Sequence, residues 1–277
     1  MEPDPQQLVN AEGESLTVDQ AIANLCQTAD GGLRYYAAWW LGRFRVSESE
    51  ALQALVAALE DENDRAPDGG YPLRRNAARA LGKLGDRTVV PALVRCLDCD
   101  DYYVRESAAQ ALGALGDERA IAALRSLLAG GVAAAVAVPG KPHLVQPYNA
   151  VLEALGNLAA RDAVSDIAPF LAHEVAQVQN AAARALYQLT GDAAYCDRLV
   201  DRLQEPNLQL RRSAMMDLGA IGYLPAAGAI AATLAENSLK LIALQGVLET
   251  HLQQSGFPTA GLTAEARQVL GLMDELL

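Results

Sequence analysis

Aromatic side chains recur at a few places in this sequence, where they could form a wall for a flat ligand. Six of the nine tyrosines lie at the starts of the expected first helices of the repeats, namely Tyr35, Tyr36, Tyr71, Tyr102, Tyr103 and Tyr148. Both tryptophans, Trp39 and Trp40, follow the first pair. Aromatic faces on neighbouring segments suit a conjugated ligand or a partner helix. The alternative is that some of them, Trp40 above all, only fill a hydrophobic core.

Arginines recur with a fixed spacing and could bind an anionic ligand. Arg34, Arg74, Arg105 and Arg211 each stand seven residues before a recurring leucine. A guanidinium group binds a carboxylate through two parallel hydrogen bonds. The alternative is a structural ladder, in which each arginine reaches an acidic group of the adjacent repeat.

One histidine stands out as a candidate acid or base. His143 lies in a Pro- and Gly-rich segment, whereas His173 and His251 lie in helical patterns. A loop histidine beside a binding site is well placed for proton transfer. Cys96 and Cys99 form a lone C-x-x-C with no second cysteine pair or nearby histidine, so we expect a structural role and no metal site.

A repeated Ala-rich phrase that ends in Leu-Gly must position these residues. Its leucines are Leu41, Leu81, Leu112, Leu155, Leu186 and Leu218, at spacings of 40, 31, 43, 31 and 32 residues. The residues four and one positions before each leucine share one helical face with it, and they are small in most copies, so this face should press against the next repeat. A second helix follows each copy. At Gly85-Asp86 and Gly116-Asp117 the glycine can stop the first helix and the aspartate can cap the second.

These repeats predict an all-α protein, a right-handed α-solenoid of about six short HEAT-like helical hairpins of about 31 residues. We expect one domain over residues 1–277, with a disordered or capping tail at 1–15 and a terminal cap at 250–277. Two insertions, 61–73 and 130–147, interrupt the array after a second helix. Equivalent junctions lie along one edge of a solenoid, so both loops should flank one site, with Tyr102 and Tyr103 between them.

Composition narrows the function. The formal net charge is −12, so nonspecific nucleic-acid binding is not expected. Four cysteines do not make a disulfide framework, and we find no secretory signal and no apolar stretch long enough to span a membrane. We therefore expect a cytoplasmic protein. The residues alone leave a noncatalytic protein-binding adaptor open.

Three segments resemble a known family. Residues 33–43 (LRYYAAWWLGR), 101–106 (DYYVRE) and 141–148 (KPHLVQPY) are similar to the E-type subunit of the heterodimeric E/F-type phycobilin lyases, which are HEAT-like repeat proteins. The resemblance runs from about residue 16 to residue 250.

The resemblance implies an enzyme that works with an F-type partner subunit. Such a pair binds an open-chain tetrapyrrole (a bilin) and attaches it by a thioether bond to one cysteine of a phycobiliprotein subunit. Phycocyanobilin transfer to the phycocyanin α-subunit is the activity we favour. The bilin is then a substrate, and no tightly bound cofactor or metal is expected.

The resemblance also assigns roles to residues. The expected bilin-binding residues are Arg34, Tyr35, Tyr36, Trp39, Arg74, Tyr102, Tyr103, Arg105, Gln146 and Tyr148. The expected catalytic residues are His143 and Asp101. A carboxylate such as Asp101 or Glu106 could hold the protonated pyrrole nitrogens, and the arginines could hold the two propionates of the bilin.

Overall fold

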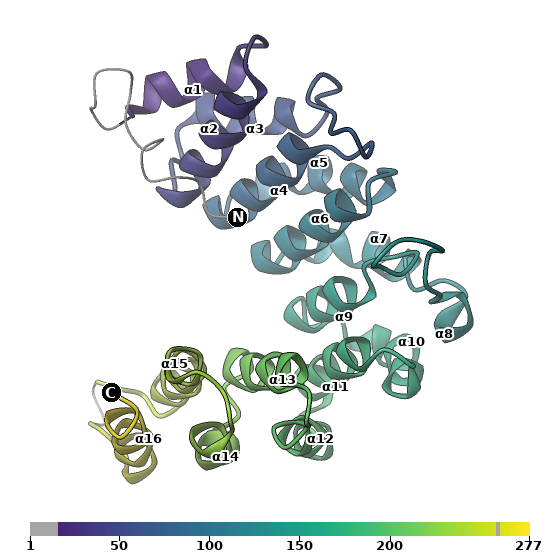
Figure 1. Ribbon diagram of the computed structural model, residues 1–277. Coiled ribbons are helices and arrows are strands. Elements are labelled where there is room, and N and C mark those ends of the chain that lie inside the picture. The colour runs from purple at the N-terminus through teal and green to yellow at the C-terminus, as the bar shows by residue number, and fades with distance from the viewer. Residues whose placement is uncertain (1–15, 259–260) are drawn as a thin grey trace. The chain divides into compact units, whose positions relative to one another are not determined.

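A computed structural model describes residues 16–258 and 261–277, and the expected tail at 1–15 lies outside them (Figure 1). The described chain is helical, and its only β-type contact is an isolated bridge between Ala137 and Leu144. Within the described ranges no helix is long and apolar enough to cross a membrane. The all-α fold of stacked helical repeats is therefore confirmed.

The chain divides into two compact units, one up to Leu158 and one from Ala159, and each is described by itself. A single domain over the whole chain stays a prediction. The helices of the first unit are α1 (Val18–Cys26), α2 (Gly31–Arg43), α3 (Ser49–Ala58), α4 (Pro72–Leu84), α5 (Val90–Arg95), α6 (Tyr102–Leu115), α7 (Ile121–Ser126), α8 (Gly131–Ala134) and α9 (Tyr148–Asn157).

The second unit continues the pattern of long and short helices. Its helices are α10 (Val164–Ile167), α11 (Ala176–Thr190), α12 (Ala194–Arg202), α13 (Leu208–Ala220), α14 (Ala227–Ala232), α15 (Asn237–Gln254) and α16 (Ala264–Asp274). The expected cap at 250–277 thus comprises the end of α15 and all of α16.

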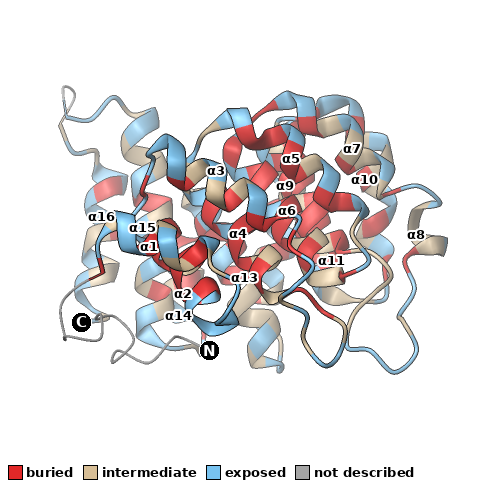
Figure 2. Cartoon of the chain, turned by 90° about the horizontal axis from the view of Figure 1, so that it is seen from above, coloured by how far each residue is buried: buried red, intermediate tan, exposed pale blue. Residues whose placement is uncertain are grey.

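Each unit has two layers of helices. In the first unit α2, α4, α6 and α9 pack side by side, and α3, α5 and α7 pack against them from the other layer. In the second unit α11, α13 and α15 form the corresponding row. Buried residues, red in Figure 2, run through α4, α6 and α9 and into α5, which places the core between the layers.

The Leu-Gly phrase is explained by close helix packing. A Cβ built on Gly42 would lie 2.7 Å from Ala80 Cα, and one on Gly82 would lie 2.8 Å from Ala111 Cα. Gly113 meets Ala154 Cα in the same way, at 2.8 Å. Each glycine therefore lets its helix approach the backbone of the next one, at the small residue just before the next recurring leucine.

The second helices are shorter than the sequence suggests. The segments before α5, α7, α10 and α14 are 3-10 turns, at Arg87–Val89, Glu118–Ala120, Arg161–Ala163 and Leu224–Ala226. Asp86 and Asp117 cap the first two of these turns by accepting hydrogen bonds from the Thr88 and Arg119 backbone amides. The Gly-Asp pair thus starts a 3-10 turn that leads into a short α-helix.

Candidate functional site

The two insertions and the start of α6 line one cleft of about 530 Å³. The first insertion contributes Asp68, Gly69 and Gly70, and the second contributes Val138, Lys141, Pro142, His143 and Val145. Between them lie Tyr102 and Tyr103, with Arg75 from α4. The sequence-based expectation that both loops flank these tyrosines is confirmed.

His143 and the two tyrosines form a compact aromatic cluster inside the cleft. The Tyr102 and His143 rings are stacked, with centroids 4.1 Å apart and planes 12° apart. Tyr103 meets both rings edge to face, at 5.2 Å from Tyr102 and 5.9 Å from His143. All three side chains are half-buried, so each keeps surface that a flat ligand could stack on.

A small hairpin in the second insertion positions His143. The Val138 amide donates to the His143 carbonyl at 3.0 Å, and the Val145 amide donates to the Val136 carbonyl at 3.0 Å. Gly140 makes the turn with a φ of +73°. The chain therefore folds back on itself, and this turn brings the histidine ring over Tyr102.

The His143 ring has an assignable tautomer. Its Nδ1 lies 2.9 Å from the Leu144 carbonyl oxygen, which can only accept, so Nδ1 carries a proton. In the neutral ring Nε2 is then the nitrogen with a free lone pair. His143 is therefore suited to accept a proton through Nε2.

Asp101 lines the cleft and stabilises the local structure through its hydrogen bonds. Its Oδ2 accepts hydrogen bonds from the Tyr71 amide at 2.7 Å and from Arg75 Nε at 2.8 Å, and its Oδ1 accepts from the Tyr103 amide, which caps α6. Burial raises the pKa of Asp101, but these hydrogen bonds and the charge of Arg75 outweigh it, so the pKa lies below the usual value. A carboxylate so fully engaged holds the cleft together and is a poor candidate for the predicted catalytic role.

Glu106 does not itself line the cleft, but it is a nearby carboxyl group with no hydrogen-bond partner among the described residues. It is half-buried on α6, one turn beyond Tyr102 and Tyr103. Burial raises its pKa, nearby Glu153 raises it further, and the charges of Arg79, His143 and Arg75 partly compensate. Glu106 therefore interacts electrostatically with residues of the cleft, and a cation bound there would stabilise its ionised form.

Arg75 was not among the expected site residues. Its guanidinium pairs with Asp101 at 2.7 Å and lies 4.6 Å from the centroid of the Tyr103 ring. Gly70 leaves room for this side chain, because a Cβ there would collide with the guanidinium group. The signal in the sequence was a second arginine directly after Arg74, next to the regular one.

The regularly spaced arginines make contacts within the array. Arg34 donates to the Leu25 carbonyl at 3.1 Å and pairs with Asp61 at 2.6 Å, with both side chains buried. Arg74 donates to the Asp61 carbonyl at 2.8 Å and pairs with Glu62. The structure thus places Arg34 and Arg74 in the ladder that was the alternative interpretation.

Arg105 and Arg211 also make contacts within the array, but their acceptors are backbone carbonyls and an amide in place of the acidic groups that the ladder predicts. Arg105 donates to the Cys99 and Val145 carbonyls and to Gln146 Oε1, at 2.5, 2.9 and 2.9 Å. Arg105 also lines the cleft, so it joins the second insertion to the start of α6, with Gln146 as its partner. Arg211 in the second unit donates to the Leu234 carbonyl at 2.8 Å.

The other predicted aromatic residues lie apart from this cleft. Tyr36 stacks on Trp39 at 5.5 Å, and both belong to α2 together with the exposed Tyr35, which does not line the cleft. Tyr148 at the start of α9 is 1 % exposed and belongs to the core. The structure therefore gathers Tyr102, Tyr103, His143 and Arg105 at the cleft, and it leaves Tyr35, Tyr36, Trp39 and Tyr148 outside it.

Cysteines and metal-binding groups do not define a further site. Burial raises the pKa of Cys96 to about 12 and that of Cys196 to about 12, so both thiols stay protonated. Within residues 16–258 and 261–277, no three His, Cys, Asp or Glu side chains are grouped so that they could hold a metal ion.

Comparison with known proteins agrees with the fold and the sequence pattern. HEAT repeats match residues 65–137 and 147–219, and the PBS lyase HEAT-like repeat matches residues 33–61. The chain is thus a HEAT-repeat protein with a loop-lined aromatic cleft. It belongs to the family of phycocyanobilin lyase alpha subunits.

The relatives cover nearly the whole chain. The phycocyanobilin lyase subunit alpha of Synechocystis sp. is 63% identical over 262 residues, which are 94% of this chain and 96% of that one. The one from Nostoc sp. is 58% identical over 277 residues and covers 100% of both chains. A solved structure of the complex of CpcE and CpcF of phycocyanin lyase from Nostoc sp. matches with a TM-score of 0.88 and 57% identity, over 99% of this chain and 100% of that one.

Proposed function

We propose that this chain is a subunit of a phycobilin lyase that binds an open-chain tetrapyrrole and attaches it by a thioether bond to a cysteine of a phycobiliprotein subunit. The chain is enzymatically active together with an F-type partner subunit. The relatives' names point to phycocyanobilin as the bilin and to phycocyanin as the acceptor protein, and the phycocyanin α-subunit is the acceptor that we favour. The observation that carries the proposal is the aromatic cleft in a chain that is 63% identical to a phycocyanobilin lyase subunit alpha.

The cleft suits the π-system of a bilin. Tyr102, Tyr103 and His143 offer ring faces and edges at the same place, and aromatic pairs favour offset-stacked or edge-to-face geometry. Pyrrole nitrogens are cationic when protonated. The Glu106 carboxylate is the group that holds them, because Asp101 is already engaged by Arg75 and two backbone amides.

The cysteine thiol that reacts with the bilin belongs to the acceptor protein. Its S–H adds across the ethylidene double bond of the bilin: sulfur bonds to one carbon, and a proton is added to the other, so no oxidant or reductant is needed. His143 Nε2 can take the thiol proton and make the thiolate nucleophile. The chain's main contribution is orientation of the two reactants, which can supply a large part of a bimolecular barrier.

The bilin passes through as a substrate and is not retained as a cofactor. The buried Cys96 and Cys196 thiols stay protonated, so they are unsuited to capture it covalently. The net charge of −12 argues against nucleic acid as a partner. We place the protein in the cytoplasm, where its acceptor would be made.

A co-expression experiment tests this function. The chain is produced with an F-type partner, a phycocyanobilin-producing system and the phycocyanin α-subunit. We expect acid-stable, zinc-fluorescent colour on the acceptor, and none when either lyase subunit is omitted. A noncatalytic adaptor would leave every phycobiliprotein subunit without a covalent chromophore.

A further inference from the structure

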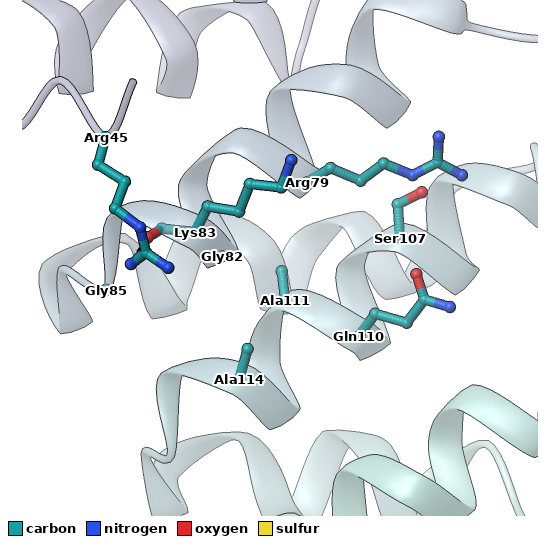
Figure 3. A pocket seen from close by; sticks show the side chains of 9 residues that line it. All are labelled: Arg45, Arg79, Gly82, Lys83, Gly85, Ser107, Gln110, Ala111 and Ala114. Carbon is teal, nitrogen blue, oxygen red and sulfur yellow. Dashed lines mark hydrogen bonds between the residues drawn. The ribbon is translucent and has the colours of Figure 1, made fainter. Parts of the chain in front are cut away.

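A second concave site lies beside the cleft, between α4 and α6. This groove has a volume of about 580 Å³, and Figure 3 shows the side chains that line it. Arg79 and Lys83 project from α4, Ser107 and Gln110 come from α6, and Arg45 comes from the turn after α2. The groove therefore contains three cations and no acidic side chain among its lining residues.

The cations of the groove differ from the arginines of the ladder. Arg79 and Lys83 are exposed, and their side chains form no hydrogen bond or ion pair with any residue from 16–258 or 261–277. By contrast, Arg34, Arg74 and Arg105 are fully engaged by carbonyls and carboxylates. Arg79 is attracted by the nearby Glu106 carboxylate but forms no ion pair with it, so the donors of Arg79 and Lys83 are available to an anion.

Arg45 occupies an unfavourable backbone conformation at the edge of this groove. Its φ is +53°, and it stands four residues after Leu41, where other repeats place Gly85, Gly116 and Gly222 with positive φ. A left-handed conformation costs a non-glycine residue roughly 1–2 kcal/mol. The Arg45 Nη1 donates to the Lys83 carbonyl at 3.0 Å, so this arginine adds a third charge to the groove at an energetic cost to the fold.

The floor of the groove contains an unsatisfied polar atom. Ser107 is 0 % exposed, and its hydroxyl has no hydrogen-bond partner. A buried hydroxyl without a partner destabilises the fold by about 1–3 kcal/mol. A ligand oxygen that reaches this hydroxyl would satisfy the donor.

The groove continues the aromatic cleft along the same two helices. On α4, Arg75 lines the cleft, and Arg79 lines the groove one turn later, about 6 Å along the helix axis. On α6, Tyr103 lines the cleft and Ser107 lines the groove, also one turn apart. Glu106 lies between the two sites, since it interacts electrostatically with both His143 and Arg79.

We propose that the groove formed by Arg45, Arg79, Lys83, Ser107 and Gln110 binds the carboxylates of the tetrapyrrole whose rings stack in the cleft. This inference rests on the function proposed above. A bilin carries two propionates on its central rings, so one molecule can present its π-system to Tyr102 and its carboxylates to Arg79. An acidic segment of a partner protein is the competing occupant.

Binding of phycocyanobilin and of its dimethyl ester tests the proposal. Both pigments are titrated into the complex of the full chain with its F-type partner, and the absorbance change gives the dissociation constants. We expect the acid to bind about tenfold tighter than the ester. In the double variant Arg79→Gln, Lys83→Gln the acid should bind about tenfold more weakly than to the unmodified complex, while ester binding stays unchanged and reports an intact cleft.

A matched variant controls for net charge. Arg95→Gln with Arg267→Gln also removes two exposed cations, neither of which lines the groove, and should keep the preference for the acid. Equal binding of acid and ester to the unmodified complex would overturn the proposal, and so would an acid preference that survives in the groove variant. A groove variant that keeps this preference but no longer binds its partner or acceptor would identify a protein segment as the occupant. If neither pigment binds the unmodified complex, the proposed function itself is contradicted.

Discussion

At the scale of single residues, the chemistry of the cleft depends on which groups remain available. Asp101 is committed to Arg75 and to the backbone at the start of α6, whereas Glu106 has neighbours but no hydrogen-bond partner among the described residues. His143 keeps Nε2 available because Nδ1 is tied to a carbonyl. We therefore propose that Glu106 holds the pyrrolic cation and that His143 Nε2 accepts the thiol proton.

Glu106 gives a pH-dependent prediction. Burial raises its pKa above the usual value, so its charge is lost at a higher pH than that of a free glutamate. We expect bilin affinity to fall as the pH drops through this raised pKa, because a neutral carboxyl cannot balance a pyrrolic cation. Glu106→Gln should bind the bilin about tenfold more weakly at neutral pH and should lose this acidic limb in an absorbance titration.

The same substitution separates binding from stability. A glutamate with a raised folded-state pKa destabilises the folded state once it ionises, so Glu106→Gln should unfold at a higher temperature than the unmodified chain at pH 7. A role in folding alone would give lower stability and an unchanged pH profile. That combination would contradict the role we assign to Glu106.

At the scale of elements, close helix contacts and the arginine ladder hold the repeats together. Gly42, Gly82, Gly113 and Gly219 each follow a recurring leucine and bring neighbouring helices into backbone contact, and the arginines bind carbonyls of the loops between helices. The cleft and the groove both depend on the fixed spacing of α4 and α6. Their geometry is therefore a product of this packing.

Gly82→Ala tests the helix contact directly. The added Cβ would lie 2.8 Å from Ala111 Cα, so the helices must separate, which costs about 1–3 kcal/mol. Gly85→Ala is the control, because its Cβ meets open space and only the φ of +79° is strained, at about 1–2 kcal/mol. Urea denaturation should rank Gly82→Ala as the less stable variant, and the reverse order would argue against the packing account.

Arg34→Met tests the ladder. The substitution leaves Asp61 buried without its partner, which should lower the free energy of unfolding by about 3–5 kcal/mol at pH 7. The pKa of Asp61 is lowered, since hydrogen bonds from Arg34 and the Asn63 amide outweigh the effect of burial. Its stabilisation is thus present at neutral pH and is lost as the pH falls through this lowered pKa.

A second substitution makes the ladder prediction decisive. The double variant Arg34→Met, Asp61→Asn should recover part of the lost stability in the same denaturation experiment. If Arg34→Met leaves the free energy of unfolding unchanged but weakens bilin binding, the ladder account of Arg34 is wrong and Arg34 belongs to the binding site.

At the scale of the whole molecule, the sequence predicted the framework and the position of the cleft better than the role of each residue. The repeat spacing placed both insertions beside Tyr102 and Tyr103, because equivalent junctions of a repeat array lie along one edge. It could not separate a structural arginine from one available to a ligand, since the partners of Arg34, the Leu25 carbonyl and Asp61, are supplied only by folding. Arg45 and Lys83 gave no periodic signal at all.

The central claim is that the cleft holds the bilin during transfer. Its most direct test is mass spectrometry of the phycocyanin α-subunit co-expressed with the F-type partner and either the Tyr102→Ala, Tyr103→Ala variant or the matched Tyr102→Phe, Tyr103→Phe variant. We expect one bilin on one acceptor cysteine with the phenylalanine variant. With the folded alanine variant, we expect the fraction of acceptor molecules that carry a bilin to be at least tenfold smaller. Normal acceptor modification by the alanine variant would contradict the central claim.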